Sequence, residues 1–155
     1  MSPFKSQDGM VHSVCFHPTR PHLYVARQSN IAVYDLQKLA LVKTLQPAGQ
    51  SISSMAVHPS TGDHVLSTSH DNRSSWIDMD LNVKPYKIFT HQSAARSGAF
   101  HPGNYPLFVI GLDSGTIAVW HATVFSDLTS NPQLVPVREL KPFKPEKKVR
   151  CYSMR

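Results

Sequence analysis

The chain has 155 residues, of which 41% are hydrophobic and 17% are charged, and its formal net charge is +6. A chain of this length can bury the core of one ordinary domain. Its apolar stretches are only a few residues long, which excludes a transmembrane segment and a signal sequence at its start. The two cysteines, Cys15 and Cys151, have neither a metal-binding nor a disulfide spacing.

The positive charge lies mostly toward the end of the chain. Residues 1–120 carry nine Lys/Arg and seven Asp/Glu, whereas residues 121–155 carry seven and three. The last segment, 141–155, lacks the apolar alternation of the preceding part, so we expect a poorly ordered basic tail. Such a tail can contact phosphates or acidic partners, or it can be a simple solvated surface.

A His-Pro pair occurs three times, and each pair closes a short apolar run. The pairs begin at His17, His58 and His101, which are 41 and 43 residues apart. After 17, 18 and 19 residues, respectively, an aromatic residue follows each pair. These aromatic residues are Tyr34, Trp76 and Trp120. A period of about 40 residues that contains several short strands is typical of WD40-type β-propeller blades.

The first repeat covers residues 11–45, after a lead-in of residues 1–10. Alternating apolar residues between turn signals predict strands at 11–16, 23–26, 31–35 and 41–45. Tyr34-Asp35 takes the place of the Trp-Asp pair after which this type of repeat is named. Four strands in one period make one blade.

The second and third repeats, residues 52–90 and 95–140, follow the same order. The predicted strands are 52–57, 64–69, 74–77, 86–90, 95–100, 107–110, 116–120 and 134–140. The segment 121–133 is longer than the corresponding segments of the first and second repeats, so we expect a surface insertion there. Pro136 would confine the last strand to a sheet edge. The predicted fold is all-β: a partial propeller of three four-stranded antiparallel blades, followed by the tail.

Some side chains are candidates for a structural role inside the blades. In this type of repeat, a His before the first strand, a Ser or Thr, an Asp in the second turn and the Trp can form one buried hydrogen-bond chain. The candidates are His91, Asp113 and Trp120 in the third repeat, Asp71 and Trp76 in the second, and Tyr34 in the first. No repeat carries the full set. We therefore expect the packing of β-branched and aromatic residues to hold the blades together.

The histidines and hydroxyl residues do not predict catalysis. Periodic spacing puts His17, His58 and His101 on separate blades, and the other histidines lack clustered ligand spacing. Ser69-His70-Asp71 resembles a catalytic triad only in its residue types, because adjacent strand residues point to opposite faces and the three side chains cannot line up. There is no glycine-rich phosphate loop of known spacing. We expect no enzyme activity, no cofactor and no metal site.

Several basic residues are candidates for contacts with RNA or a protein partner. Arg73 lies in the second-repeat turn, and Arg96 begins the inner strand of the third repeat. The tail contributes Lys141, Lys144, Lys147, Lys148 and Arg150. Each of these is also compatible with an ordinary solvated charge.

Specific segments resemble the carboxy-terminal propeller of the eukaryotic ribosome-biogenesis family called block of proliferation in animals, with its fungal counterpart. The segments that carry the resemblance include residues 31–36, 76–81, 113–117, 121–124, Asn131-Pro132 and Val135-Pro136. The resemblance extends over about residues 2–140. It includes the segment after Trp120 as well as the blade pattern.

This resemblance implies a non-enzymatic scaffold in the biogenesis of the large ribosomal subunit and the maturation of its precursor RNA. The implied partners are a pescadillo-type protein, a second WD-repeat protein and pre-ribosomal RNA, and the implied location is the nucleolus and nucleoplasm. The family has seven blades and a long amino-terminal region that contacts pescadillo, so we expect a partial chain with open sheet edges. The alternative is a WD-repeat protein-interaction fragment without a ribosomal role.

Overall fold

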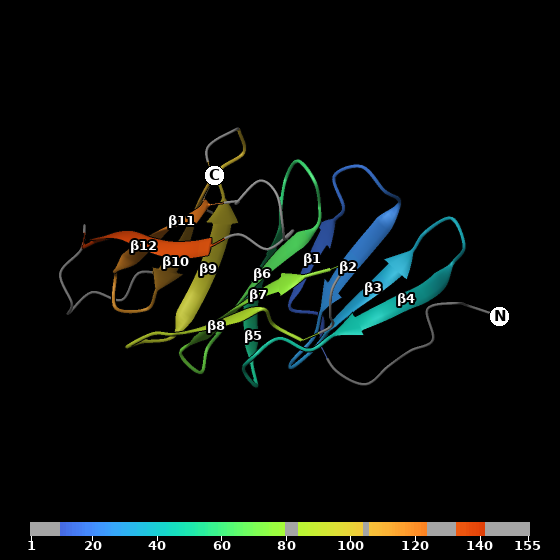
Figure 1. Cartoon of the computed structure of the whole chain (residues 1–155). Helices are drawn as coiled ribbons and strands as arrows, with labels where there is room; N and C mark the ends of the chain where they lie inside the picture. Colours follow the sequence, from blue (N-terminus) through green and yellow to red (C-terminus); the bar gives the residue numbers. More distant parts are fainter. Residues whose placement is uncertain (1–9, 80–83, 104–105, 124–132, 142–155) are drawn as a thin grey trace.

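The computed structural model describes residues 10–79, 84–103, 106–123 and 133–141. Within these ranges the chain forms three antiparallel four-stranded sheets, which lie side by side (Figure 1). None of the described residues is helical, and accordingly none belongs to a helix that could cross a membrane. The prediction of three four-stranded antiparallel blades is confirmed.

Each blade consists of four strands that pair in chain order. Blade 1 contains β1 (Ser13–Phe16), β2 (His22–Ala26), β3 (Ile31–Asp35) and β4 (Ala40–Leu45). Blade 2 contains β5 (Ile52–Val57), β6 (His64–Ser69), β7 (Arg73–Asp78) and β8 (Lys87–Thr90). Blade 3 contains β9 (Ala95–Phe100), β10 (Leu107–Leu112), β11 (Ile117–Thr123) and β12 (Gln133–Leu140).

Blade 3 shows the main differences from the predicted strand ends. β11 continues to Thr123, because residues 121–123 pair with residues 133–135 of β12. The start of the predicted insertion is therefore strand, and residues 124–132 lie outside the described residues. Pro136 lies on the edge strand β12 next to a bulge, opposite Trp120, as its missing N–H requires.

The repeated His-Pro pair has one structural role in all three blades. The Nδ1 atom of His17 accepts hydrogen bonds from the backbone N–H groups of Thr19 and Arg20, both at 3.0 Å. Nδ1 of His58 accepts from the N–H of Ser60 at 3.4 Å, and Nδ1 of His101 accepts from the N–H of Gly103 at 2.9 Å. The neutral ring thus closes the turn after the first strand of each blade, in the way that Asn and Asp close other turns.

This role makes stability sensitive to mild acid, because a protonated ring loses its Nδ1 acceptor. Burial is the main cause that lowers the pKa of His17, His58, His70 and His91 below the usual range. Histidines in the unfolded chain titrate near pH 6.5, so below that pH the unfolded state binds more protons than the folded state. We expect the free energy of unfolding in urea to fall from pH 7.5 to pH 5.5.

His58→Asn provides a matched control for this prediction, since the Asn oxygen can accept the same bond and does not titrate in this range. The variant should show a shallower decrease between the two pH values. The lowered pKa values of Asp35 and Asp71 affect stability only at lower pH, where carboxylates become protonated. A free energy of unfolding that stays constant or rises on acidification would contradict the assigned role.

Two apolar cores lie between the blades. The first joins blade 1, with Tyr24 and Val33, to blade 2, with Val57, Val65 and Ile77. The second core joins blades 2 and 3 and contains Leu66, Trp76, Phe89 and Phe108, with Phe100 and Trp120 packed against it. Gly98 allows β9 to lie close to β6, because a Cβ atom there would be 2.9 Å from Cδ2 of Leu66.

We call the face of blades 1 and 2 that packs against the following blade the leading face and the opposite face the trailing face, and we use the same names for the matching faces of blade 3. Cross-strand pairs define one row of side chains on each face. The trailing rows are Phe16–Leu23–Tyr34 in blade 1, Val57–Val65–Ile77 in blade 2 and Phe100–Phe108–Trp120 in blade 3. The leading rows are Cys15–Tyr24–Val33, Ala56–Leu66–Trp76 and Ala99–Val109–Val119.

These rows correct the predicted equivalence of the three aromatic residues. Tyr34 and Trp120 lie on trailing faces, whereas Trp76 lies on the leading face of blade 2. Ile77 occupies the position that matches Tyr34 and Trp120. An offset of one residue along a strand reverses the face on which a side chain lies. The spacing of 18 residues from His58 concealed this offset.

Candidate interaction surfaces

The predicted structural residues of the third repeat contact different partners. Nε2 of His91, which directly follows β8, lies 2.8 Å from Oγ of Ser74 on β7, so this pair fixes the start of the β8–β9 connection to blade 2. Asp113 accepts hydrogen bonds from Nε and Nη2 of Arg96, at 3.1 and 3.3 Å. Trp120 packs edge-on against Phe89 of blade 2, with ring centroids 4.6 Å apart.

Partly buried hydroxyl groups add a polar connection between blades 2 and 3 that sequence reasoning missed. Oγ of Ser53 donates to the carbonyl of Ala95 at 2.5 Å and lies 2.9 Å from Oγ1 of Thr68. The bond between Ser53 and Ala95 shows that apolar packing is not the only link between these two blades. Ser53 and Ala95 are 42 residues apart in the sequence, so no local pattern indicates their contact.

Two aspartates organise turns by accepting backbone hydrogen bonds. Asp35 accepts from the N–H groups of Gln37 and Lys38, both at 2.9 Å, and the bond from Lys38 is the main cause of its lowered pKa. Asp71 accepts from the N–H of Gln50 at 3.0 Å. Burial alone would raise the pKa of Asp71, but the bonds from Ser69 and Gln50 and the charge of Arg73 lower it.

The triad-like segment at residues 69–71 is used in structural contacts. Oγ of Ser69 donates to the carbonyl of Ser51 at 2.9 Å, while Asp71 holds the N–H of Gln50. Both contacts fix the connection between blades 1 and 2 to the β6–β7 turn. Within the described part of the chain, no group of three His, Cys, Asp or Glu side chains is arranged to hold a metal ion.

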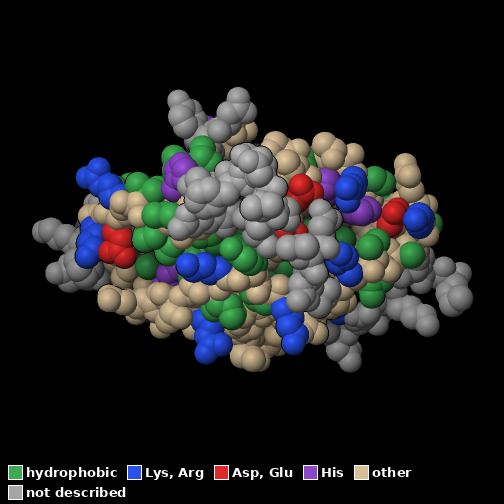
Figure 2. Space-filling view, in the orientation of Figure 1, with side chains coloured by type: hydrophobic (Ala, Val, Ile, Leu, Met, Phe, Trp, Pro, Cys, Tyr) green, Lys and Arg blue, Asp and Glu red, His purple; other side chains and the backbone are tan. Residues whose placement is uncertain are grey.

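The predicted basic contact residues occupy different surroundings. The guanidinium of Arg96 is held by Asp113, whereas Arg73 is exposed at the start of β7. Lys141 is exposed just after β12. Lys144, Lys147, Lys148 and Arg150 lie outside the described residues. Lys and Arg side chains are scattered over the face in Figure 2 rather than gathered in one patch.

Arg73 lies beside an open hollow between blades 1 and 2, which we call the Arg73 hollow. Its volume is about 600 Å³, and its walls are the β4–β5 connection, with Gln46 and Gln50, and the region around Lys84 and Ile88. Two basic residues with polar side chains beside them suit an anionic group better than an apolar one.

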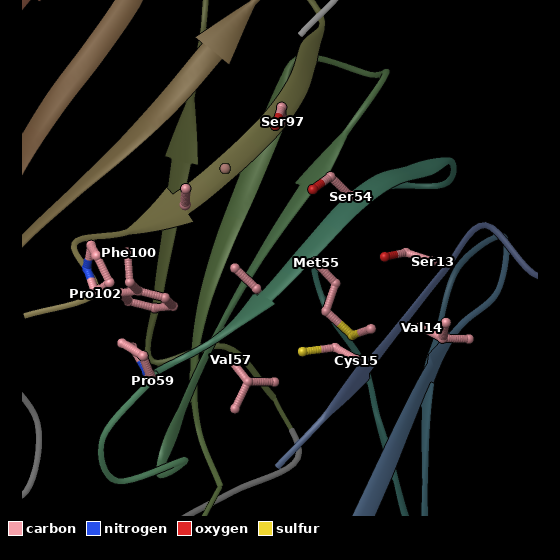
Figure 3. Close-up of a pocket in the computed structure, with 13 residues that line it drawn as sticks. Ser13, Val14, Cys15, Ser54, Met55, Val57, Pro59, Ser97, Phe100 and Pro102 are labelled. Atoms are coloured by element: carbon pink, nitrogen blue, oxygen red, sulfur yellow. The ribbon is translucent and has the colours of Figure 1, made fainter. Parts of the chain in front are cut away.

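The first strands of the three blades form a second concave surface, the inner groove. It has a volume of about 700 Å³ and is lined by β1, β5 and β9 with the prolines of two His-Pro pairs, Pro59 and Pro102. Figure 3 shows Met55 and Cys15 pointing toward each other between β5 and β1. Burial is the main cause that raises the pKa of the Cys15 thiol, which keeps it protonated. The groove is mostly apolar with a few serines.

Comparisons with known proteins agree with the fold and with the resemblance in sequence. No protein-family model matches the chain. The chain is similar to the β-propeller domain of Cps50 (Swd1) from Myceliophthora thermophila, with a TM-score of 0.68 and 17% identity. That match covers 85% of this chain and 40% of the propeller domain, and it establishes the propeller fold alone.

Curated relatives match at much higher identity. Ribosome biogenesis protein BOP1 of Rattus norvegicus is 49% identical to this chain and that of Homo sapiens is 47% identical, in each case over 141 residues. Ribosome biogenesis protein ERB1 of Yarrowia lipolytica is 46% identical over 141 residues. Each match covers 90% of this chain but only 17–19% of the relative. The chain is therefore a homologue of the BOP1 and ERB1 ribosome biogenesis proteins over one segment, which is less than a fifth of their length.

Proposed function

We propose that the chain is a non-enzymatic scaffold module in the biogenesis of the large ribosomal subunit. The observation that carries the proposal is the 46–49% identity to ribosome biogenesis proteins over 141 residues. The match covers 90% of this chain, so it includes most or all of each blade. Such a role places the chain in the nucleolus and nucleoplasm.

The architecture supports a binding role rather than catalysis. The described histidines that repeat with the blades close turns, and the residues of the triad-like segment hold backbone groups. What remains exposed is a set of concave surfaces and blade faces, which suit protein partners. The proposed partners are a second WD-repeat protein and a pescadillo-type protein of the same complex.

We assign the contact with pre-ribosomal RNA to the Arg73 hollow. Arg73 is exposed and lines the hollow together with Lys84, so the hollow carries two positive charges. Arg96 is a weaker candidate, because Asp113 already holds its guanidinium through two hydrogen bonds. Lys141 and the basic residues that follow it extend the positive charge available to RNA.

Affinity purification of the tagged chain from nuclear extract tests this function. We expect precursor RNA of the large subunit to be recovered over precursor RNA of the small subunit, together with the two protein partners. Arg73→Glu should lower RNA recovery severalfold and leave protein recovery unchanged, because reversing one charge at a phosphate contact replaces attraction by repulsion.

Lys38→Glu is the matched control, since it makes the same charge change in the exposed β3–β4 turn. It should leave RNA recovery near that of the unmodified chain. Equal losses in both variants would refute the assignment of RNA to the Arg73 hollow and indicate a diffuse charge effect. Recovery of protein partners without any ribosomal precursor would favour a WD-repeat interaction fragment with no ribosomal role.

A further inference from the structure

The Arg73 hollow has one wall whose backbone is held in place by hydrogen bonds to blade 2. The N–H of Ala48 donates to Oγ of Ser75 at 2.7 Å, and Ser75 is buried. The N–H of Gln50 donates to the carboxylate of Asp71 in the β6–β7 turn at 3.0 Å. Because both bonds fix the β4–β5 connection, this wall loses little conformational freedom when a ligand binds.

Amide side chains gather around this hollow. Asn30, Gln46 and Gln50 line it, and Gln46 and Gln50 are exposed. An amide carries a donor and an acceptor side by side, which matches the pattern along the edge of a nucleotide base. A phosphate group presents acceptors only, so a phosphate contact does not account for these amides. They suit the edge of a base.

An apolar side chain lines the same hollow. Ile88, on the edge strand β8, is 52% exposed, and Pro85 also belongs to the lining. Apolar surface next to polar groups suits the flat face of a base, because this face stacks on apolar and aromatic side chains. The positive charge is supplied by Arg73, which is exposed at the start of β7.

These three kinds of group match the phosphate, the base edge and the base face, and we infer that the hollow holds one unpaired nucleotide of an RNA strand. The inference rests on the proposed contact between RNA and the Arg73 hollow. The volume of about 600 Å³ lies within the range of about 300–1,000 Å³ that is typical of small-ligand pockets. In a duplex the bases are stacked and paired, so only an unpaired nucleotide presents both its face and its edge. The lining residues all lie between Ser29 and Ile88, within blades 1 and 2 and their connections.

The test is the fluorescence anisotropy of a short labelled RNA, single-stranded or annealed to its complement, on titration with the full chain. We expect the single strand to bind about tenfold more tightly, because the duplex loses the contact with the base. Ile88→Ala should lower the affinity for the single strand severalfold and leave the affinity for the duplex unchanged, since it removes apolar surface but no charge. Arg73→Glu should weaken the binding of both RNAs and reduce its salt dependence.

Gln46→Ala and Gln50→Ala test the contact with the base edge. We expect the unmodified chain to distinguish homopolymeric strands of adenosine, cytidine and uridine, and each variant to reduce these differences in affinity. Gln37→Ala, in the exposed β3–β4 turn, is the control and should not reduce them. Val137→Ala is the control for Ile88→Ala, because Val137 is 56% exposed on β12 and does not line the hollow. Circular dichroism verifies that each variant is folded.

The outcomes separate this inference from the proposed function. Equal affinity for the single strand and the duplex, with both weakened by Arg73→Glu, would overturn the inference and leave the RNA contact standing. An unchanged single-strand affinity in Ile88→Ala, or an equal loss in Val137→Ala, would also overturn it. A folded chain that binds neither RNA would overturn the inference together with the assignment of RNA to the hollow.

Discussion

Replacing Trp76 with Ala is expected to destabilise the chain by about 3–5 kcal/mol, a large part of the stability of a typical domain. Trp76 is 1% exposed and packs against Phe108 and Phe100 of blade 3, with centroid distances of 5.0 and 5.4 Å. Its indole N–H also donates to Nδ1 of His64 at 3.2 Å. The substitution therefore removes the centre of the core that joins blades 2 and 3.

Urea unfolding followed by circular dichroism measures this effect without relying on the tryptophan signal. Trp76→Phe keeps most of the packing and loses the indole hydrogen bond, so it should cost less, about 1–2 kcal/mol. Tyr86→Ala, at a half-exposed aromatic residue outside this core, should change stability by about 0.5 kcal/mol or less. A cost below about 1 kcal/mol for Trp76→Ala would contradict the assigned core.

Gly62→Ala is expected to cost about 2 kcal/mol or more, for two separate reasons. Gly62 has a φ of +70°, where residues with a side chain are strained. A Cβ atom there would also overlap Nε2 of His17, whose ring is buried between blade 1 and the β5–β6 turn. The ring cannot move freely, because Nδ1 holds the turn after β1.

A double-mutant cycle with His17→Ala separates the two reasons. Without the imidazole, the cost of Gly62→Ala should fall to the backbone strain alone, about 1 kcal/mol. The free energies of unfolding of the four chains give the coupling directly. The same cost for Gly62→Ala in both backgrounds would exclude the contact between Gly62 and His17.

The strands that the sequence predicts best are those with apolar alternation between clear turns. Segments 31–35, 52–57, 64–69 and 95–100 match the observed strands residue for residue. Turn residues and the period of two are local features, so they can be read without knowing the partner strand. The threefold His-Pro pair likewise predicted the number of blades.

The sequence predicts less well the features that depend on contacts between residues far apart in the chain. Trp76 was matched with Tyr34 and Trp120 because all three follow a His-Pro pair at similar distances, yet its strand register places it on the other face. The contact between Arg96 and Asp113 spans 17 residues, and nothing local distinguishes a paired arginine from an exposed one. These contacts depend on the register between paired strands, because a shift of one residue moves a side chain to the opposite face of the sheet.

The central claim, that the three blades form a scaffold module of large-subunit assembly, is tested most directly by the RNA recovered with the tagged chain. The quantity to measure is the ratio of large-subunit to small-subunit precursor RNA after purification from nuclear extract. The account predicts a ratio well above that in the extract, and a Trp76→Ala chain with a disrupted core should lose this enrichment. A ratio equal to that of the extract for the unmodified, folded chain would contradict the claim.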